Sequence, residues 1–99
     1  MSEPDEPLDE PLKARDAREL VRRVLAEGTV SYTGHAQREM DKDDMSTVDC
    51  ENVLRGGAVD EAEFEHGAWR HRVRTQKFVL VVEFESRDEL VIVTAWRNR

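Results

Sequence analysis

The chain has 99 residues, enough for one domain, and a formal net charge of -7 at pH 7. It has no apolar run long enough to span a bilayer and no positively charged apolar leader, so we expect neither a membrane span nor a secretory signal. The single cysteine, Cys50, excludes an internal disulfide, is expected in the core and suits a cytoplasmic location.

Charge is distributed unevenly along the chain. The first eleven residues, MSEPDEPLDEP, contain five acidic residues and no basic one, whereas residues 66–99 contain seven Arg or Lys against four acidic residues. We predict a disordered acidic Pro-rich tail at residues 1–12 and a single toxin-like α+β domain at 13–99. Such a composition is typical of a tail that keeps a protein soluble. Alternatively, it is a polyanion that binds in cis over a basic surface or docks on a partner.

The first part of the domain is predicted to be helical. Apolar residues recur at helical spacing over 13–27, and Gly28 suits the end of that helix. The segment TVSYT at 29–33 is a possible short strand.

Two shorter helices are expected to follow. Thr33 is a plausible N-cap for a helix over HAQREMDK at 35–42. Ser46 caps a third helix, with Asp49 in the capping-box position, and Gly56-Gly57 ends it.

From residue 58 onward the apolar period changes to two, which indicates strands. Helices followed by a strand meander predict an α+β domain, with N-terminal helices packed on one face of a twisted antiparallel sheet of about four strands. The predicted strands are 58–65, 68–75, 77–84 and 89–96.

Two-residue turns at Thr75-Gln76 and Arg87-Asp88 set the expected strand pairing. They place Arg72 opposite Val79, Val81 opposite Thr94, and Val79 opposite Trp96. One face of the sheet is then apolar and suits the core. It carries Trp69, His71, Val73, Phe78, Leu80, Val82, Phe84, Val91, Val93 and Ala95.

The opposite face is predicted to be basic. It carries Arg70, Arg72, Arg74, Lys77, Val79, Val81, Glu83, Thr94 and Trp96. Alternating arginines are also typical of an ordinary solvated strand. However, like charges side by side stabilise nothing, which favours a polyanion ligand. Arginine binds phosphate and tryptophan stacks on bases, so we expect single-stranded RNA as the ligand. The RNA-binding residues expected are Arg38, Arg74, Lys77, Trp96 and Arg97.

The segment SYTGHAQREM places His35, Arg38 and Glu39 within one and a half helical turns. The positive end of the helix and Arg38 both disfavour imidazolium at His35, and a neutral imidazole suits a general base. Glu39 at i+4 would orient the ring or offset these two cationic effects on His35. The alternative is an ordinary His–Glu pair on a helix face. The sequence has no CxxC or HxxxH pattern, P-loop or dinucleotide fingerprint, so we expect neither a metal nor a cofactor.

Four blocks in order resemble the bacterial family called domain of unknown function 4258. They are HAQREM, DCENVLRGG, GAWRHRVRT and ELVIVTAWR, and together they span about residues 30 to 97. The resemblance implies a small fold like that of the RelE, BrnT and MqsR toxins. It also implies a metal-independent ribonuclease of a toxin–antitoxin pair, with a zinc-finger, helix-turn-helix antitoxin as the expected partner.

The family's leading histidine falls on His35, its strand arginines on Arg70 and Arg72, and its last-strand threonine on Thr94. Where the common family pattern has arginines, this chain has Glu39 and Asp43. An aromatic often found between the strand arginines is replaced here by His71.

These observations lead to two hypotheses. In the first, the protein is an endoribonuclease toxin in which a 2′-hydroxyl attacks the adjacent phosphate. His35 with Glu39 would transfer the proton, Arg70 and Arg72 would hold the phosphate, and Thr94 would donate a hydrogen bond to it. In the second, the protein is catalytically inactive, and its basic sheet face docks RNA or an acidic protein partner.

Overall fold

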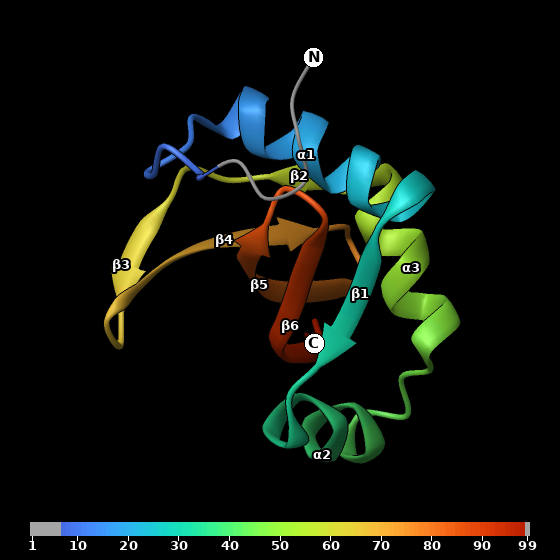
Figure 1. Ribbon diagram of the computed structural model, residues 1–99. Helices are drawn as coiled ribbons and strands as arrows, with labels where there is room; N and C mark the ends of the chain where they lie inside the picture. The colour runs from blue at the N-terminus through green and yellow to red at the C-terminus, as the bar shows by residue number, and fades with distance from the viewer. Residues whose placement is uncertain (1–6, 99) are drawn as a thin grey trace.

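The computed structural model describes residues 7–98 (Figure 1). Within them lie three helices, α1 (Ala14–Glu27), α2 (Gly34–Lys42) and α3 (Thr47–Gly56). A short strand, β1 (Thr29–Tyr32), separates α1 from α2. The strands after α3 are β2 (Ala58–Val59), β3 (Glu63–Glu65), β4 (Ala68–Arg74), β5 (Phe78–Ser86) and β6 (Glu89–Arg97). The predicted α+β class and the three predicted helices are confirmed.

The short helices begin where local capping chemistry places them. The Thr33 hydroxyl accepts a hydrogen bond from the Ala36 N–H at 2.9 Å. At α3 the Ser46 hydroxyl accepts from the Asp49 N–H at 3.1 Å, and the Asp49 carboxylate accepts from the Ser46 N–H at 2.9 Å. Both caps satisfy backbone N–H groups that the first helical turn leaves unpaired, as the sequence predicted.

The sheet is mixed, with strand order β1-β6-β5-β4-β2, and β3 also pairs with β4. β1 runs parallel to β6, with Thr29 opposite Glu89, whereas the other pairs are antiparallel. The expected antiparallel sheet of about four strands is therefore corrected to a six-stranded mixed sheet. The predicted strand 58–65 is split into β2 and β3 because residues 60–62 leave the regular ladder.

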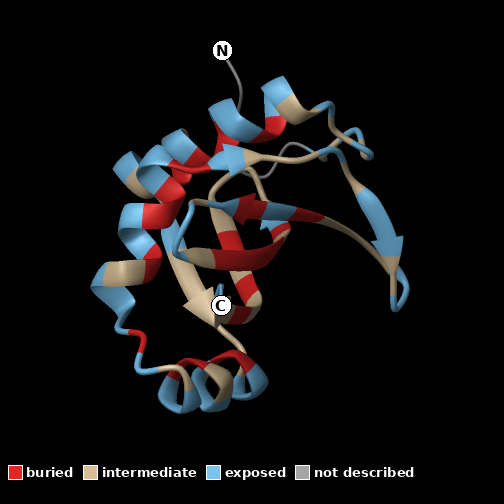
Figure 2. Cartoon of the chain, turned by 180° about the vertical axis from the view of Figure 1, so that it is seen from behind, coloured by how far each residue is buried: buried red, intermediate tan, exposed pale blue. Residues whose placement is uncertain are grey.

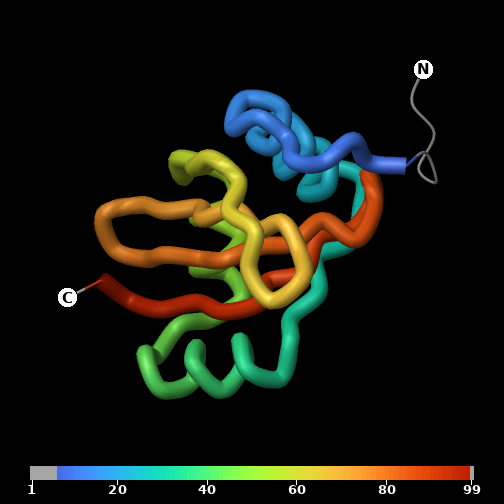
Figure 3. The backbone as a smooth tube through the Cα atoms, turned by 90° about the vertical axis from the view of Figure 1, so that its left-hand side faces the viewer, coloured from blue at the N-terminus to red at the C-terminus, as the bar shows by residue number. Residues whose placement is uncertain are grey.

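Helices α1 and α3 cover one face of the sheet, and the buried residues lie between these layers (Figures 1 and 2). Cys50 of α3 is fully buried there, and burial raises the pKa of its thiol to about 11. Helix α2 follows β1 and packs along the second half of β6. Figure 3 looks onto the opposite face, where no helix of residues 7–98 crosses β4, β5 or β6. We call this the outer face.

The β4–β5 register differs from the prediction by two residues. The turn is formed by residues 76–77, because the Thr75 N–H donates to the Phe78 carbonyl at 2.9 Å. Arg72 therefore lies opposite Val81 rather than Val79, and Lys77 lies in the turn rather than on a strand. A shift of two preserves which face each side chain occupies, so the β4 arginines keep their predicted side.

Between β5 and β6, Val81 lies opposite Thr94 and Val79 opposite Trp96, as predicted. Register shifts occur between Val81 and Val82 and between Phe84 and Ser86. A bulge reverses the facing of the residues that follow it. Consequently Leu90 and Ile92 are fully buried, and the predicted core positions Val91 and Val93 are only half-buried.

The N-terminal segment can be followed from residue 7. We predicted residues 1–12 to be disordered; residues 1–6 lie outside the described part of the chain. Within 7–12, Leu8 and Leu12 pack against the hydrophobic core. Among the helices of the described residues, none has the length and apolar character needed to cross a membrane.

Candidate functional site

The outer face carries a basic and aromatic patch made from three strands. Arg72 of β4, Val81 of β5 and Thr94 of β6 lie in one cross-strand row. Trp96 lies in the next row, and the Arg72 guanidinium carbon is 6.0 Å from the centroid of its ring. We call Arg72, Thr94 and Trp96 the Arg72–Trp96 patch.

The floor of this patch is apolar. Val79 and Val81 are each only 6% exposed, although they lie outside the core cluster between sheet and helices. Long arginine stems and the indole ring of Trp96 are the neighbours that can cover them on this face. Arg72 itself is exposed and makes no ion pair within residues 7–98. Its positive charge is therefore available to a ligand.

The positive charge of the neighbouring Arg70 is less available to a ligand than that of Arg72. Its Nε lies 2.7 Å from Oε1 of Glu83, and the two side chains are only 17% and 21% exposed. A half-buried carboxylate this close neutralises the guanidinium and holds its orientation. Arg70, which the sequence predicts to be catalytic, is thus ion-paired with Glu83.

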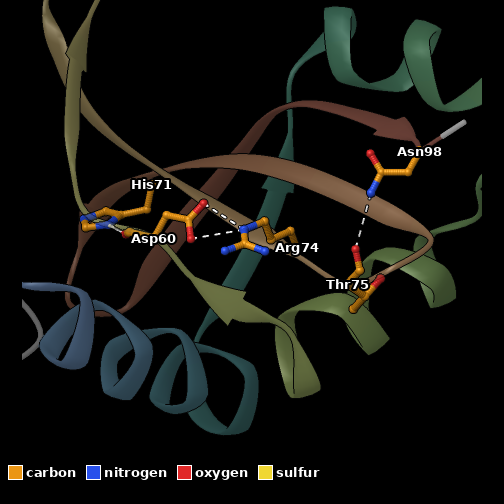
Figure 4. A network of polar contacts seen from close by, with 5 residues as sticks. All are labelled: Asp60, His71, Arg74, Thr75 and Asn98. Carbon is orange, nitrogen blue, oxygen red and sulfur yellow. Dashed lines mark hydrogen bonds and ion pairs between the residues drawn. The ribbon is translucent and has the colours of Figure 1, made fainter.

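Arg74 is also paired. Its Nε donates to both carboxylate oxygens of Asp60, at 3.1 and 3.0 Å, and this hydrogen bonding raises the pKa of Arg74 (Figure 4). The Asp60 carbonyl lies 2.9 Å from Nδ1 of the buried His71. Asp60 therefore ties the edge of the sheet to two residues of β4 on opposite faces.

The last predicted RNA-binding arginine, Arg97, holds α2 against β6. Its backbone N–H donates to the Asp43 carboxylate at 2.7 Å, and its guanidinium donates to the Asp43 and Asp44 carbonyls at 3.1 and 3.0 Å. The guanidinium also lies 4.9 Å from the centroid of the Phe78 ring. Asp43 is one half of this link.

The start of α2 is fixed to the part of β6 that leads into Thr94. The Thr33 hydroxyl donates to the Val93 carbonyl at 2.8 Å, and the Thr33 N–H donates to the Ile92 carbonyl at 3.1 Å. Thr94 follows Val93 directly, and His35 follows Thr33 by two residues. The two bonds therefore bring the first turn of α2 to the row of the sheet that contains Thr94.

Helical periodicity shows which way His35 points. Ala36 and Met40 form the buried ridge of α2. Gln37 and Asp41, on one flank of that ridge, line a cavity of about 330 Å³ with the segment that leads into α3. His35 lies on the opposite flank. Because α3 covers the inner face of the sheet, we infer that His35 lies toward the outer face.

The polar trio of α2 does not form a His–Glu couple. Oε2 of Glu39 lies 3.0 Å from Nζ of Lys42, whereas His35 is exposed and forms no hydrogen bond or ion pair within the described residues. Arg38 folds back over the first turn, where its Nη1 would be 3.3 Å from a side chain added at Gly34.

The remaining predicted residue, Lys77, faces another part of the surface. It lines a cavity of about 440 Å³ between α3 and the β4–β5 turn, together with Asp49 and Asn52. No group of three or more His, Cys, Asp or Glu side chains within residues 7–98 is placed to hold a metal ion.

The sequence reasoning missed the role of two acidic residues, Glu83 and Asp60. Glu83 was placed on the correct face, but the predicted register set it two residues away from Arg70. A turn at 76–77 in place of 75–76 would have brought the two residues opposite each other. Asp60 had no comparable signal, because the irregular segment that carries it follows no strand period.

Comparison with known families gives one match. The model of the family described as "Domain of unknown function (DUF4258)" matches residues 32–97, which include every member of the patch, His35 and strands β4, β5 and β6. No curated protein and no solved structure matches the chain.

Proposed function

This chain belongs to the family described as a domain of unknown function (DUF4258), and we propose that it binds single-stranded RNA on the outer face of its sheet. The observation that carries the proposal is Arg72, an exposed guanidinium without an ion pair in residues 7–98, next to the ring of Trp96. The other sheet-face arginines, Arg70 and Arg74, already have carboxylate partners.

The chemistry of the patch suits one phosphate and one neighbouring base of an RNA strand. A guanidinium forms paired hydrogen bonds with phosphate oxygens, and an indole stacks on any base. The hydroxyl of Thr94, in the same row as Arg72, can donate to the phosphate or to a ribose oxygen. A splayed single strand exposes both phosphate and base to a flat sheet, whereas a duplex hides its bases.

Fluorescence anisotropy with a labelled 12-nucleotide RNA tests this proposal. We expect Arg72→Ala and Trp96→Ala each to weaken binding by about tenfold, in line with the loss of one phosphate contact or one stacked base. The matched control is Arg74→Ala, two residues away on the same strand but bound to Asp60, and it should change affinity less than twofold.

The salt dependence of RNA affinity provides a second measurement on the same variants. Removal of one phosphate contact lowers the slope of log affinity against log salt by about 0.7 for a single strand, so Arg72→Ala should show this loss and Trp96→Ala should not. If Arg74→Ala weakens binding as much as Arg72→Ala, diffuse positive charge rather than the patch binds the RNA, and the proposal is wrong.

A second candidate function, RNA cleavage, is favoured by the position of His35. We propose that its imidazole removes the proton from a 2′-hydroxyl, whose oxygen attacks the adjacent phosphorus. The bond to the 5′-oxygen breaks, this oxygen takes a proton from water, and the imidazolium returns its proton to solvent. The products are a 2′,3′-cyclic phosphate and a 5′-hydroxyl. Arg72 and Thr94 would stabilise the additional negative charge on the phosphate. We assign no direct role to Glu39 or Arg70. Glu39 is ion-paired with Lys42, and Arg70 is ion-paired with Glu83.

Incubation of the protein with RNA and a chelator, scored for cyclic-phosphate ends, tests cleavage. His35→Ala should reduce the rate by about a hundredfold or more, the usual contribution of a general base, and should leave RNA affinity within twofold. Gln37→Ala, on the other flank of α2, is the control and should cleave normally. A wild-type protein that binds RNA but leaves it intact supports the catalytically inactive alternative.

The cellular role that accompanies cleavage would be that of a toxin with a RelE-, BrnT- or MqsR-like fold and a dedicated antitoxin. Induced expression of the wild-type chain alone should then arrest growth, and expression of Arg72→Ala should not. Harmless wild-type expression, together with intact RNA in the cleavage assay, would instead favour the alternative of a module that docks RNA or an acidic protein.

A further inference from the structure

The β3–β4 hairpin presents an aromatic side chain at the edge of the sheet. Phe64 of β3 is 60% exposed, one of only two large apolar side chains exposed to this degree in the described residues. Its ring meets Trp69 of β4 edge-on, with centroids 5.1 Å apart. The hairpin extends beyond the body of the molecule, as Figures 1 and 2 show for β3.

The turn of this hairpin fixes which backbone groups point outward. His66 and Gly67 both have positive φ, at 50° and 81°, which is typical of a two-residue type I′ turn. The flanking pair, Glu65 and Ala68, then exchanges both hydrogen bonds, so the N–H and C=O of Phe64 point away from β4. Within residues 7–98, β3 pairs with no other strand.

The same edge is strongly acidic. Residues 60–65 contain Asp60, Glu61, Glu63 and Glu65, and no Lys or Arg occurs between residues 56 and 69. Asp60 is paired with Arg74, but the three glutamates have no ion-pair partner among the described residues. Because strand side chains alternate, Glu63 and Glu65 flank Phe64 on the opposite side of the strand.

We propose that the edge of β3 binds an extended basic segment of a partner protein, which adds to the sheet as a further strand. Its Lys or Arg side chains would lie beside Glu63 and Glu65, and an apolar residue between them would cover Phe64. The partner segment therefore alternates basic and apolar residues. RNA, and a second copy of the same edge, would both meet like charge here.

A charged edge strand can also serve only to prevent unwanted pairing between copies of a protein. That function requires charge and does not explain an exposed phenylalanine between the glutamates. An exposed aromatic ring at an otherwise charged edge is instead typical of a binding surface. The proposal is independent of RNA binding, because the residues involved lie outside the Arg72–Trp96 patch.

Synthetic peptides provide the probe. The test peptide is Lys-Val-Lys-Val-Lys-Val-Lys with blocked ends, and its comparison has Glu in place of each Lys. Two further peptides carry N-methyl groups on all valines or on all lysines, which removes alternate backbone donors. Calorimetry with the full chain measures affinity, and amide shifts of the labelled chain locate the site.

We expect the lysine peptide to bind with shifts centred on residues 63–65, and the glutamate peptide not to bind. Phe64→Ala and Glu63→Lys should each weaken binding by about tenfold, as expected for loss of a central contact. The control, Glu85→Lys, makes the same charge change at an exposed position near the end of β5 and should change affinity less than twofold. One of the N-methylated peptides should lose binding.

Three results would overturn the proposal. One is absence of lysine-peptide binding at millimolar concentration. Another is an equal loss of affinity in Glu63→Lys and Glu85→Lys, which would show a general charge effect. The third is unchanged affinity of both N-methylated peptides, because strand addition requires backbone hydrogen bonds. Thermal unfolding of each variant confirms that it is folded.

Discussion

At the scale of single residues, three arginines at alternate positions of β4 have three different environments. Arg70 is paired with Glu83, Arg74 with Asp60, and Arg72 lies beside an aromatic ring. Alternation in the sequence was sufficient to predict that they share a face. It could not predict which one remains unpaired, because the carboxylate partners come from other parts of the chain and depend on register.

The Arg70–Glu83 pair makes a stability prediction. Glu83→Ala leaves a guanidinium that is mostly shielded from water without its partner, which should lower the free energy of unfolding by about 1–3 kcal/mol. Urea unfolding followed by circular dichroism measures this change. Glu85→Ala, exposed and two residues further along β5, should cost less than about 0.5 kcal/mol. Similar values for both variants would show that the pair contributes nothing specific.

At the scale of elements, local signals identified most of the fold. The caps at Thr33 and Ser46 and the change of apolar period at residue 58 depend only on neighbouring residues, and the structure follows them. The two β5–β6 register shifts were not predictable, because β6 is apolar on both faces and its period does not distinguish them. The attachment of residues 7–12 also depends on distant packing, through Leu8 and Leu12.

Glu10 makes that N-terminal attachment sensitive to pH. Burial raises the pKa of its carboxyl group; the charge on Glu83 adds to this effect and that on His71 opposes it. The folded protein therefore binds more protons at Glu10 than the unfolded chain. Stability linked to this group is fully present below the ordinary carboxyl pKa and is lost as pH rises through the raised value.

Glu10→Gln removes this dependence, since the amide stays neutral. We expect the variant to gain stability relative to wild type between pH 4 and pH 7, as measured by urea unfolding at each pH. Glu27→Gln, at the exposed end of α1, makes the same chemical change away from the segment and serves as the control. A difference between wild type and Glu10→Gln that stays constant with pH would contradict the proposed role of Glu10.

At the scale of the whole molecule, the topology joins segments that are far apart in the sequence. β1 pairs in parallel with β6, and Thr33 then bonds to Val93, which sets the first turn of α2 beside Thr94. No local pattern reveals a parallel partner sixty residues away, so the mixed sheet was missed although its strands were identified. This long-range link fixes Thr33 to β6, and our inference that His35 lies toward the outer face depends on it.

The distribution of charge is also a property of the whole molecule. The chain is acidic overall at -7, yet within residues 7–98 Arg72 on the outer face and the glutamates of the β3 edge form no ion pair. An acidic protein of this kind can bind RNA only through a local contact, because its overall field repels a polyanion. The two surfaces therefore suit ligands of opposite charge.

The two tryptophans provide the most direct test of RNA binding at the patch. Trp96 belongs to it, whereas Trp69 contacts Phe64 in the β3–β4 hairpin. In a labelled sample titrated with a 12-nucleotide single-stranded RNA, the indole N–H signal of Trp96 should move and that of Trp69 should stay in place. A shift of the Trp69 signal alone, or of neither signal while RNA binds, would contradict an RNA site at Arg72, Thr94 and Trp96.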